Sequence, residues 1–563
     1  MKVVIIGGVA GGATAAARLR RLDEHAEIII FERSGYISYA NCGLPYYIGG
    51  VIEEESALTL QSPESFRRRF RVDVRVLHEV TAIHPVEKTV TVKDLKTGDI
   101  FTQAYDKLLL SPGAKPVIPA YSGVSGENVF TLRTVEDTLR IHDFVKTKKP
   151  SSAVIIGGGF IGLETAENLR HLGMDVTVVQ RGNQLLGILD GDMASFLHAK
   201  CRAMGMRLCF SANVTDVASD GASVRVELKN GASLSADMAV VAIGVTPENT
   251  LAKAAGLALG AKGAIAVNDR METSVPDIYA VGDAVEVRHT VTGERAVISL
   301  AGPANKQGRI AADNICGGES RYVGSQGSSV IKVFDMTAAA TGINEKTAKA
   351  LGLSYEKVIL SPSSHAGYYP GAKVMTMKVL YEKGTKKLLG AQIVGFDGVD
   401  KRIDVLATAI MAGLPADRLK DLDLAYAPPY SSAKDPVNMA GFLIDNVESG
   451  RMKQFFFEDI DALRARTDVT LLDTRTDGEY RGGHAAGFIH IPLDSLRERL
   501  SELDPEKPVY VMCQSGLRSY LATRILIGYG FDAYNFAGGY RLYSSILHDQ
   551  EAASVSLPCG MEI

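Results

Sequence analysis

Cys42 stands alone in the segment 38–46, which reads SYANCGLPY. The next cysteine along the chain is Cys201, so no second thiol is close in sequence. A redox thiol without such a neighbour must rest, when oxidised, as a mixed disulfide with a small thiol, as a persulfide or as a sulfenic acid. If Cys42 carries redox chemistry, the sequence therefore indicates that its reaction partner is a small molecule.

Cys513 begins a second segment whose residues could carry out a reaction, the loop 513–519, which reads CQSGLRS. A predicted strand at 509–512 leads into this loop, and a predicted helix follows it. Backbone N–H groups that point inward at a helix start form a concave site for anions. We expect a persulfide anion on Cys513 to be stabilised there, with Arg518 closing the ring around it.

Gly7 and Gly12 lie in the first of two glycine-rich turns, between a predicted strand and an alanine-rich helix. Glycines at a helix N-terminus let backbone N–H groups approach a pyrophosphate. Glu32, at the end of the next predicted strand, can accept hydrogen bonds from ribose hydroxyls. Val9 stands where the dinucleotide fingerprint has its middle glycine. The pattern predicts a dinucleotide-binding unit with one departure from the usual motif.

Gly157, Gly159 and Gly162 form the second turn, in register with the fingerprint. The next predicted strand ends at Gln180 and Arg181, where an acid would accept from the 2′-hydroxyl of NADH and repel a 2′-phosphate. An arginine can instead pair with a phosphate through two parallel hydrogen bonds. The sequence therefore favours NADPH, or the use of both nicotinamide cofactors.

The elements that must position these residues repeat along the chain. Strand, glycine turn, helix and strand recur about 150 residues apart, which indicates two parallel sheets of the doubly wound type. Between residues 320 and 445 the pattern changes to alternating strands, at 374–380 and 388–394, followed by a helix near 403–412. A polar stretch after Val447 precedes a small α/β module.

Composition excludes several classes of protein. The 563 residues include 61 Lys and Arg against 65 Asp and Glu, a net charge of −4, so broad electrostatic binding of nucleic acid or membrane is not expected. Six scattered cysteines without a CxxC pair argue against a disulfide framework, a zinc ribbon and a thioredoxin motif, and they favour the reducing cytoplasm. The glycines that interrupt the N-terminal apolar run favour a nucleotide-binding unit over a signal peptide, and no membrane span is predicted.

Three further segments resemble motifs of flavoproteins that have two dinucleotide-binding folds. They lie at 110–114 (LSPGA), 242–247 (AIGVTP) and 273–283 (TSVPDIYAVGD). The resemblance implies FAD in the first unit, held by Gly7, Gly12, Glu32, Arg33, Ser111, Gly113 and Asp283. It implies NADPH or NADH in the second, held by Gly157, Gly159, Phe160, Gly162, Glu164, Gln180, Arg181 and Gly244, with Phe160 as an aromatic gate over the flavin.

The lone Cys42 resembles the redox centre of the single-cysteine pyridine nucleotide-disulfide oxidoreductases, since reductases of the glutathione type carry CxxxxC. That branch includes coenzyme A disulfide reductases, persulfide reductases, NADH oxidases and NADH peroxidases. The segments 365–371 (HAGYYPG) and 425–436 (AYAPPYSSAKDP) resemble the coenzyme A disulfide reductases. This implies that Tyr368 and Tyr426 reach the active site of the other subunit of a homodimer, and that the surroundings of Cys42 keep its thiol ionised. The coenzyme A contacts implied are Thr14, Arg18, Arg21, Ser38, Asn41 and Lys434, with Arg69 and Arg71 in place of a basic residue expected near Phe70.

The C-terminal module resembles a rhodanese. The resemblance rests on the segments 471–475 (LLDTR), 484–492 (HAAGFIHIP), the Cys513 loop and 536–540 (FAGGY). Related phosphatase loops are one residue longer, so the resemblance implies sulfur transfer by Cys513 and Arg518. No motif surrounds Cys201, Cys209 or Cys316, and Cys559 lies near the C-terminus.

These observations predict an α/β chain with two dinucleotide-binding (Rossmann-like) domains, an α+β dimerisation domain and a C-terminal rhodanese-like α/β domain. The expected parts are the FAD-binding domain at 1–150 and 269–320, the NAD(P)-binding domain at 151–268, the dimerisation domain at 321–445, a linker at 446–453, the rhodanese-like domain at 454–548 and a tail at 549–563.

The function implied is FAD-dependent reduction of CoA disulfide, CoA persulfide or polysulfide by NAD(P)H through Cys42, coupled to a sulfurtransferase. Two alternatives stay open. One is an NADH oxidase or peroxidase that shares the single cysteine. The other is a sulfur-trafficking or redox-sensing protein whose turnover is incidental. The expected partners are CoA thiols, disulfides and persulfides, donors of sulfane sulfur and a second copy of the chain, without nucleic acid or membrane.

Overall fold

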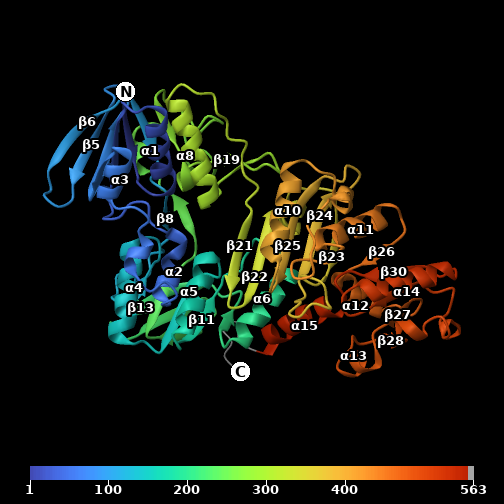
Figure 1. The fold of residues 1–563 in the computed structure, drawn as a ribbon. Helices are drawn as coiled ribbons and strands as arrows, with labels where there is room; N and C mark the ends of the chain where they lie inside the picture. The colour runs from blue at the N-terminus through green and yellow to red at the C-terminus, as the bar shows by residue number, and fades with distance from the viewer. Residues whose placement is uncertain (556–563) are drawn as a thin grey trace. The chain divides into compact units, whose positions relative to one another are not determined.

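The computed structural model describes residues 1–555 and divides them into two compact units. The first unit comprises Met1–Asn183 and Met206–Gly327. The second comprises Gln184–Gly205 and the chain from Ser328 onward (Figure 1). Cys559, singled out above, lies outside the described residues. Among residues 1–555, no helix is long and apolar enough to cross a membrane, and no cluster of side chains could hold a metal ion.

A parallel sheet forms the N-terminal half of the first unit. Its strand order is β18-β7-β1-β2-β3, and the strands are β1 (Lys2–Ile6), β2 (Glu27–Glu32), β3 (Asp73–Val76), β7 (Lys107–Leu110) and β18 (Ile278–Ala280). Helices α1 (Ala10–Leu22) and α8 (Ala301–Ile315) pack side by side against it (Figure 1). Residues 3–6 and 28–31 are buried, as expected of a sheet covered on both faces. An antiparallel sheet of β4 (His78–His84), β5 (Thr89–Asp94) and β6 (Ile100–Ala104) adjoins it.

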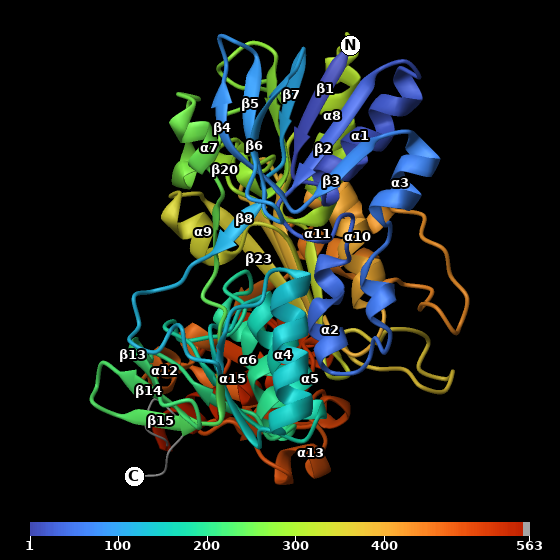
Figure 2. The same ribbon diagram turned by 90° about the vertical axis from the view of Figure 1, so that its left-hand side faces the viewer.

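A second parallel sheet repeats this design. Its order is β12-β11-β10-β16-β9, and the strands are β9 (Val129–Phe130), β10 (Ser152–Ile156), β11 (Asp175–Val179), β12 (Arg207–Cys209) and β16 (Met238–Val241). Helix α2 (Leu44–Ile48) contacts both α4 (Val135–Lys148) and α5 (Phe160–His171), as Figure 2 shows. An antiparallel pair, β8 (Ala114–Pro116) with β17 (Val245–Pro247), connects the two halves, and β13 (Val214–Ser219), β14 (Val224–Leu228) and β15 (Ser233–Ala236) form a small antiparallel sheet.

The second unit contains an antiparallel sheet of order β21-β22-β25-β24-β23. Its strands are β21 (Ser329–Val333), β22 (Met336–Gly342), β23 (Tyr355–Leu360), β24 (Thr376–Glu382) and β25 (Leu388–Gly395). Helices α10 (Val399–Met411) and α11 (Pro436–Glu448) cover one face of this sheet with their apolar sides and complete its core. The strands and helix predicted from the alternating pattern all form here, with boundaries that differ by a few residues.

A five-stranded parallel sheet of order β26-β30-β29-β27-β28 makes up the C-terminal part. Its strands are β26 (Lys453–Phe455), β27 (Thr470–Asp473), β28 (Ile489–His490), β29 (Val509–Met512) and β30 (Ala533–Phe536). Helices α14 (Leu517–Gly528) and α15 (Gly539–Val555) follow β29 and β30. Because α11 ends at Glu448 and β26 begins at Lys453, the connection is shorter than the linker expected at 446–453. Helix α15 also takes in residues 549–555, which the sequence had indicated as tail.

Helix α6 (Gly191–Ala203) belongs to the second unit, although its sequence falls within the region predicted as the NAD(P)-binding domain. Its side chains explain this placement. Buried His198 contacts the Asp549 carboxylate through Nδ1 at 2.8 Å, and Arg202 Nη1 donates to the same carboxylate at 2.6 Å. The hydroxyls of Ser195 and Ser545 lie 2.8 Å apart. Helix α6 is therefore fastened by polar contacts to α15, at the far end of the chain.

Buried ion pairs join three parts of the second unit. Lys378, fully buried on β24, bonds Asp192 of α6 at 2.8 Å and also contacts Glu345. Lys357, on the neighbouring strand, bonds Glu345 at 3.0 Å and Glu458 of the C-terminal part at 2.7 Å. Lys378 is the buried centre of this network, and removing a buried partner of an ion pair costs about 3–5 kcal/mol. These pairs therefore hold α6 and the C-terminal part against the antiparallel sheet.

Candidate functional site

The two glycine turns have the same geometry. Gly7 and Gly157 adopt left-handed φ values of 96° and 115°, and a Cβ at either would lie 2.1 or 2.3 Å from the carbonyl oxygen of Ser111 or Ala242. A Cβ on Gly12 would lie 1.9 Å from the carbonyl oxygen of Gly7, and the same distance separates the equivalent atoms of the second turn. Only glycine fits these places, so each helix starts directly against its strand with its N–H groups accessible.

The middle positions of the turns differ in residue but not in backbone. Val9 has a φ of −99° and Gly159 a φ of −85°, both ordinary values for any residue. Valine therefore replaces the expected glycine without backbone strain. At Gly159, apart from its neighbours along the chain, no atom of the described residues lies within 4 Å of the place where a Cβ would be. The second turn thus leaves open space beside its N–H groups, which fits the approach of a pyrophosphate.

Glu32 and Gln180 occupy equivalent places beside the turns. The Gly8 N–H donates to Glu32 Oε2 at 2.8 Å, and the Gly158 N–H donates to Gln180 Oε1 at 3.0 Å. Burial raises the pKa of Glu32, and its backbone hydrogen bonds oppose that shift. The same contact is thus made by an acid in the first unit and by a neutral amide in the second. Arg181, next to the amide, is exposed, as is Arg33 after the acid.

Arg133 links three segments that are far apart in the sequence. Its Nη2 donates to Asp283 Oδ2 at 2.9 Å, and its Nε donates to the Ala114 carbonyl at 3.2 Å, next to Gly113. The Asn41 side-chain oxygen accepts from its Nη1 at 3.0 Å in the favoured amide orientation. Burial raises the pKa of Asp283, and Arg133 opposes the rise. The first unit therefore brings two predicted FAD residues and a predicted CoA contact to one guanidinium.

Gly113 and Gly244 mark the crossing between the two halves of the first unit. Both take left-handed φ values, 74° and 125°, immediately before β8 and β17. The Val117 N–H donates to the Gly244 carbonyl at 3.0 Å. The two strand-end motifs predicted from the sequence thus meet in one antiparallel pair.

Cys42 lies in a short 3₁₀ turn, Asn41–Gly43, directly before α2, and its side chain is exposed. Partial loss of solvent around the sulfur raises the pKa of the thiol, Glu164 raises it further and Arg133 lowers it. We expected the surroundings to keep this thiol ionised. The protein groups alone raise the pKa of the thiol instead, because desolvation disfavours a charged sulfur and the Glu164 carboxylate repels a thiolate.

Among the acidic side chains, Glu164 has the largest effect on the pKa of Cys42. It lies on α5 after Phe160, the first residue of that helix, and both side chains are half-buried. Burial raises the pKa of Glu164 to about 7, the hydrogen bond from Tyr46 opposes this and Glu167 adds to it. The Tyr46 hydroxyl lies 3.5 Å from Glu164 Oε1. A carboxyl that titrates near neutral pH can gain or lose a proton during turnover.

The residues predicted to contact coenzyme A are only partly free to do so. Arg18 Nε donates to Asp313 Oδ1 at 2.7 Å, so its charge is already paired, whereas Arg21 on the same helix is exposed. Thr14 Oγ1 donates to Asn305 Oδ1 at 2.5 Å. Of the two basic residues predicted on this helix, Arg18 therefore has an acid partner and Arg21 is exposed. Asp313 is a partner from α8, almost 300 residues away, that the local spacing could not reveal.

Arg69 and Arg71, the substitutes proposed near Phe70, both stand at the surface. Arg71 ends α3 (Pro63–Phe70) with a left-handed φ of 49° and lies 3.4 Å from Glu24. Ser38, before Cys42, also takes a left-handed φ, 46°. An arginine cluster is thus available, with one member in a loose surface ion pair.

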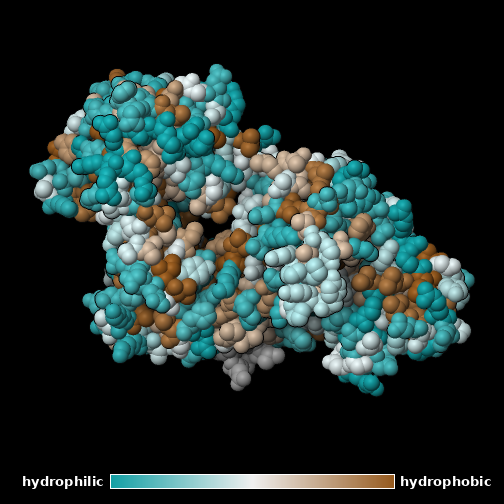
Figure 3. Space-filling model, viewed as in Figure 1, coloured by the Kyte–Doolittle hydropathy of each residue, from teal (hydrophilic) through white to brown (hydrophobic). Residues whose placement is uncertain are grey.

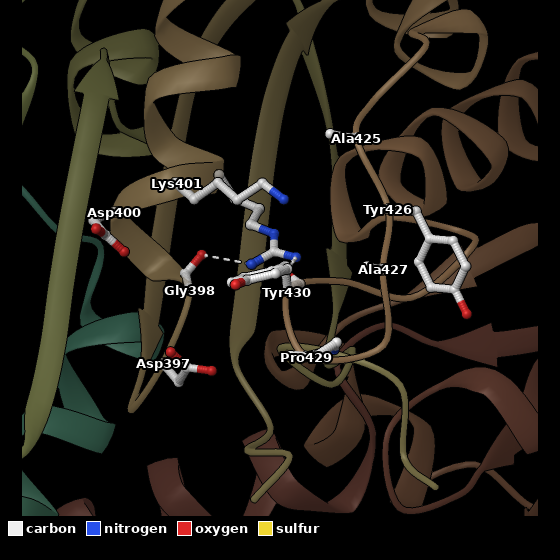
Figure 4. A pocket seen from close by; sticks show the side chains of 10 residues that line it. Asp397, Gly398, Asp400, Lys401, Ala425, Tyr426, Ala427, Pro429 and Tyr430 are labelled. Atoms are coloured by element: carbon white, nitrogen blue, oxygen red, sulfur yellow. Dashed lines mark hydrogen bonds between the residues drawn. The ribbon is translucent and has the colours of Figure 1, made fainter. Parts of the chain in front are cut away.

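Tyr368 and Tyr426 meet in the second unit. Their hydroxyls lie 2.8 Å apart, and the side chains are 77% and 46% exposed. Their hydrogen bond raises the pKa of Tyr426. A pocket of about 470 Å³ adjoins Tyr426, with Lys401 and Tyr430 in its lining, and Figure 4 shows the Tyr426 ring turned away from the Tyr430 ring. Lys434, another predicted CoA contact, is exposed.

Cys513 is buried at the start of its loop. The Gly516 N–H donates to its Sγ at 3.1 Å, and Ser519 Oγ donates to the same sulfur at 3.2 Å. Gly516 has a φ of 96°, which turns the loop into α14. The predicted anion cradle is thus built from one backbone and one side-chain donor.

Arg518 is engaged by a carboxylate. Its two terminal nitrogens donate to the two oxygens of Glu479, each at 2.7 Å. This pairing lowers the pKa of Glu479 to about 2. The sequence predicted that Arg518 closes the ring around an anion on sulfur, but the structure shows its guanidinium bound to an acid from the short helix α13 (Asp477–Arg481).

Family models match most of the chain. The model for pyridine nucleotide-disulphide oxidoreductases matches residues 1–308, its dimerisation domain matches 328–436, and the rhodanese-like domain matches 457–545. The chain belongs to the pyridine nucleotide-disulphide oxidoreductases. The predicted fold class is confirmed, including the rhodanese-like C-terminal part. Membership implies a flavin and a pyridine nucleotide as cofactors, and the two glycine turns fit that pair.

Within this oxidoreductase family, similar proteins fall in two size classes. The coenzyme A disulfide reductase of Staphylococcus haemolyticus is 37% identical over 443 residues, 78% of this chain and 98% of that protein. Two solved structures are matched over nearly the whole chain, including the rhodanese-like part. Reduced Bacillus anthracis CoADR-RHD is 49% identical with a TM-score of 0.95, covering 97% of this chain and 98% of that one. A NAD-dependent persulfide reductase from A. fulgidus is 39% identical with a TM-score of 0.91, covering 96% and 100%.

Two residues of the candidate sites in this oxidoreductase were not predicted from the sequence. Arg133 stands directly before Thr134, the N-cap of α4, and its role depends on partners in other segments. Glu479 stands three residues after Thr476, where Thr-x-x-Glu forms a capping box, so its local pattern pointed to helix capping alone. Both are charged residues next to a helix start. That position is the only local signal either one gave.

Proposed function

We propose that this protein is a FAD-dependent oxidoreductase that uses NAD(P)H to reduce CoA disulfide, CoA persulfide or polysulfide at Cys42, and that its rhodanese-like domain transfers sulfane sulfur through Cys513. One observation carries the proposal. A single chain combines an exposed lone thiol in a two-dinucleotide unit with a buried thiol held by N–H and O–H donors. The first suits a small-molecule disulfide, and the second suits a bound persulfide anion.

Cys42 would act as the nucleophile toward sulfur. Its thiolate attacks one sulfur of a CoA disulfide, the S–S bond breaks, and one CoA thiolate leaves while a Cys42–CoA mixed disulfide forms. Two electrons and a proton then return Cys42 to the thiolate and release the second CoA as a thiol. Bound FAD would supply those electrons from the nicotinamide. Glu164, with its pKa near 7, is the side chain best suited to give the proton.

The cofactor sites follow from the two turns. We assign FAD to the first turn with Glu32, Ser111, Asp283 and the newly recognised Arg133, and NAD(P)H to the second with Phe160, Glu164, Gln180, Arg181 and Gly244. The neutral Gln180 amide in the place of Glu32 supports tolerance of a 2′-phosphate, since it brings no negative charge against that group. Exposed Arg181 can pair with it.

Coenzyme A would bind across a homodimer, which the match to a dimerisation domain supports. From one subunit we assign Thr14, Arg18, Arg21, Ser38, Asn41, Arg69 and Arg71, and from the other Tyr368, Tyr426 and Lys434. The exposed, hydrogen-bonded phenols can stabilise and protonate a leaving thiolate. Arg21 would supply the less encumbered charge for the CoA phosphates.

The test is the state of Cys42 in the purified protein. Peptide mass spectrometry should find coenzyme A in disulfide linkage to Cys42, and added NAD(P)H should release it. A sulfenic acid on Cys42, together with NAD(P)H oxidation that needs only oxygen or peroxide, would favour the oxidase reading. A protein from which no sulfur compound draws electrons would overturn the proposal.

A further inference from the structure

We propose that Glu479 sets the donor specificity of the Cys513 site and makes it a site for organic persulfides, R–S–SH, in preference to thiosulfate. The inference rests on the proposed sulfurtransferase function and names its substrate class. It starts from the charges around the loop. A rhodanese loop that takes a dianion needs a cation free to meet that dianion, and the structure shows where the cations of this loop are directed.

Arg518, the arginine of the loop, is bound by two hydrogen bonds of 2.7 Å to Glu479. The carboxylate is itself held in place, because the N–H and hydroxyl of Thr476 donate to its Oε2 at 2.9 and 3.0 Å. Both side chains are about one-third exposed, so the pair stands at the rim of the site. Planar two-point pairs of this kind are among the stronger polar contacts in proteins.

Arg475 is the second guanidinium beside the loop, and its Nη1 lies 3.5 Å from the side chain of Gln514. It is buried against Asp473, with an Nη2–Oδ2 distance of 2.8 Å, and it stacks on Tyr540 at 3.8 Å from the ring centroid. Its charge is therefore balanced within the core. The two guanidinium groups and two carboxylates next to Cys513 sum to zero.

Arg541 is the third arginine near the loop, since its backbone N–H donates to the Gln514 carbonyl. Its side chain turns elsewhere. The guanidinium carbon lies 5.3 Å from the centre of the Phe196 ring on α6. Its Nε has no hydrogen-bond partner among the described residues, and its contact is with the aromatic ring on α6.

This arrangement of charges favours a persulfide over a dianion. Thiosulfate carries two charges, and leaving water without a cation in direct contact costs a group of that kind far more than it costs a singly charged or neutral one. Glu479 adds repulsion at the rim. The persulfide group of an organic donor brings at most one charge. After transfer, that charge belongs to a sulfur bonded to Cys513 Sγ, the atom to which Gly516 and Ser519 donate.

The rim of the loop is also apolar. Leu517 and Leu521 lie one turn apart at the start of α14 and are 52% and 44% exposed. Figure 3 shows hydrophobic side chains gathered over α14. Exposed leucines beside a reactive sulfur suit the carbon chain of an organic donor and offer nothing to an inorganic ion.

The transfer step balances without an added oxidant. The Cys513 thiolate attacks the outer sulfur of R–S–SH, a new S–S bond forms at Cys513, and the S–S bond of the donor breaks. The proton of the donor, which starts on the outer sulfur, passes to the leaving thiolate, so the products are the Cys513 persulfide anion and R–SH. With thiosulfate the same attack would release sulfite, and a dianion would have to enter and leave.

The experiment compares two donors on the full-length protein with cyanide as acceptor, following thiocyanate. The persulfide of 2-mercaptoethanol, which carries no charge outside its sulfur atoms, represents the organic class, and sodium thiosulfate represents the dianion. In the wild type, kcat/KM should favour the persulfide. In Glu479→Gln, which keeps the shape but frees one arm of Arg518, the thiosulfate-to-persulfide ratio of kcat/KM should rise at least tenfold, mainly through KM for thiosulfate. The ratio is independent of the fraction of protein that is folded.

Glu502→Gln is the matched control, because Glu502 forms a similar two-point pair with Arg499 at 2.6 and 2.8 Å on an exposed surface of the same part. It should leave the ratio unchanged. An unchanged ratio in Glu479→Gln, or an equal shift in both variants, would overturn the inference while sulfur transfer stands. Thiocyanate production from neither donor in the wild type would instead overturn the proposed sulfurtransferase itself.

Discussion

Cys42 and Cys513 present the same atom in opposite settings. Cys42 is exposed on a 3₁₀ turn, with protein groups that on balance raise the pKa of its thiol. Cys513 is buried, and two donors already point at its sulfur. The first arrangement leaves room for a large substrate and for cofactors that bring their own charge. The second is complete within one loop and needs only a sulfur atom to be delivered.

The contrast shows which residues each cysteine depends on. A loop whose donors lie within six residues of the cysteine can stabilise an anion with local structure alone. A thiol that works beside cofactors depends on groups gathered from several segments, here Glu164 on α5 and Arg133 before α4. We therefore expect substitutions to separate the two cysteines functionally, with effects on one activity at a time.

Cys42→Ser should have the largest effect. NAD(P)H-driven reduction of CoA disulfide should fall by at least about a thousandfold, as expected when a nucleophile is removed. The visible flavin spectrum should be retained, because the proposed flavin site consists of glycines, acids and Arg133. Cys316→Ser, a partly exposed cysteine of the same unit, is the control and should behave as wild type. Near-normal turnover of the serine variant would show that Cys42 is not the redox centre.

Cys513→Ser should abolish the activity proposed for the buried cysteine. Transfer of sulfane sulfur to cyanide should be lost by a similar factor, since the serine hydroxyl is far less nucleophilic than a thiolate. Reduction of preformed CoA disulfide should continue. The two assays run on both cysteine variants form a cross-check. Equal loss of both activities in Cys513→Ser would mean that the two sites are obligately linked or that the variant is misfolded.

Gln180→Glu tests the smaller contrast between the two glycine turns. Placing an acid where Glu32 stands in the first turn should lower the NADPH-to-NADH ratio of kcat/KM about tenfold, or about 1.4 kcal/mol, by repelling the 2′-phosphate. Gln180→Ala removes the contact with Gly158 without adding charge and separates the two contributions. A wild-type preference for NADH beyond about a hundredfold would already contradict the proposed tolerance of NADPH.

Glu164→Gln should produce the smallest change. Above pH 7 the carboxylate is ionised and opposes the thiolate, so its removal should lower the pKa of Cys42 and speed alkylation at pH 8 by about threefold. Below pH 6, where Glu164 is already protonated in the wild type, the two proteins should react alike. Tyr46→Phe, which removes the hydroxyl without a charge, is the control. Slower alkylation of the glutamine variant at pH 8 would reverse the sign argued here.

The sequence predicted those parts of the site that are formed by residues close together along the chain. Both glycine turns and the Cys513 loop depend on residues within a few positions of one another, and their spacing carried the geometry. Contacts across the fold were not predictable in this way. Arg18 pairs with Asp313 from a helix near the end of the first unit. Arg518 pairs with Glu479 from another helix, and the pKa of Cys42 depends on how α2 packs near Glu164.

The boundaries of the second unit show the same limit. Helix α6 was placed by sequence order with the nucleotide-binding strands that flank it, whereas its buried histidine and acids find their partners on α15 and β24. Periodicity can indicate that a helix has a buried side. It does not say which distant segment covers that side, because this depends on charges that meet only after folding.

The contacts of Asp549 with His198 and Arg202 bear on how the chain can be divided. A staphylococcal relative is matched over 98% of its own length by 78% of this chain, so a related protein is complete without the remainder. Here, cutting the chain after α11 would remove the carboxylate that α6 bonds and the glutamate that buried Lys357 bonds. Buried His198 would lose its acid partner as well. We therefore expect the truncated chain to be less stable than the full-length protein, so the residues before β26 are not a self-contained fragment.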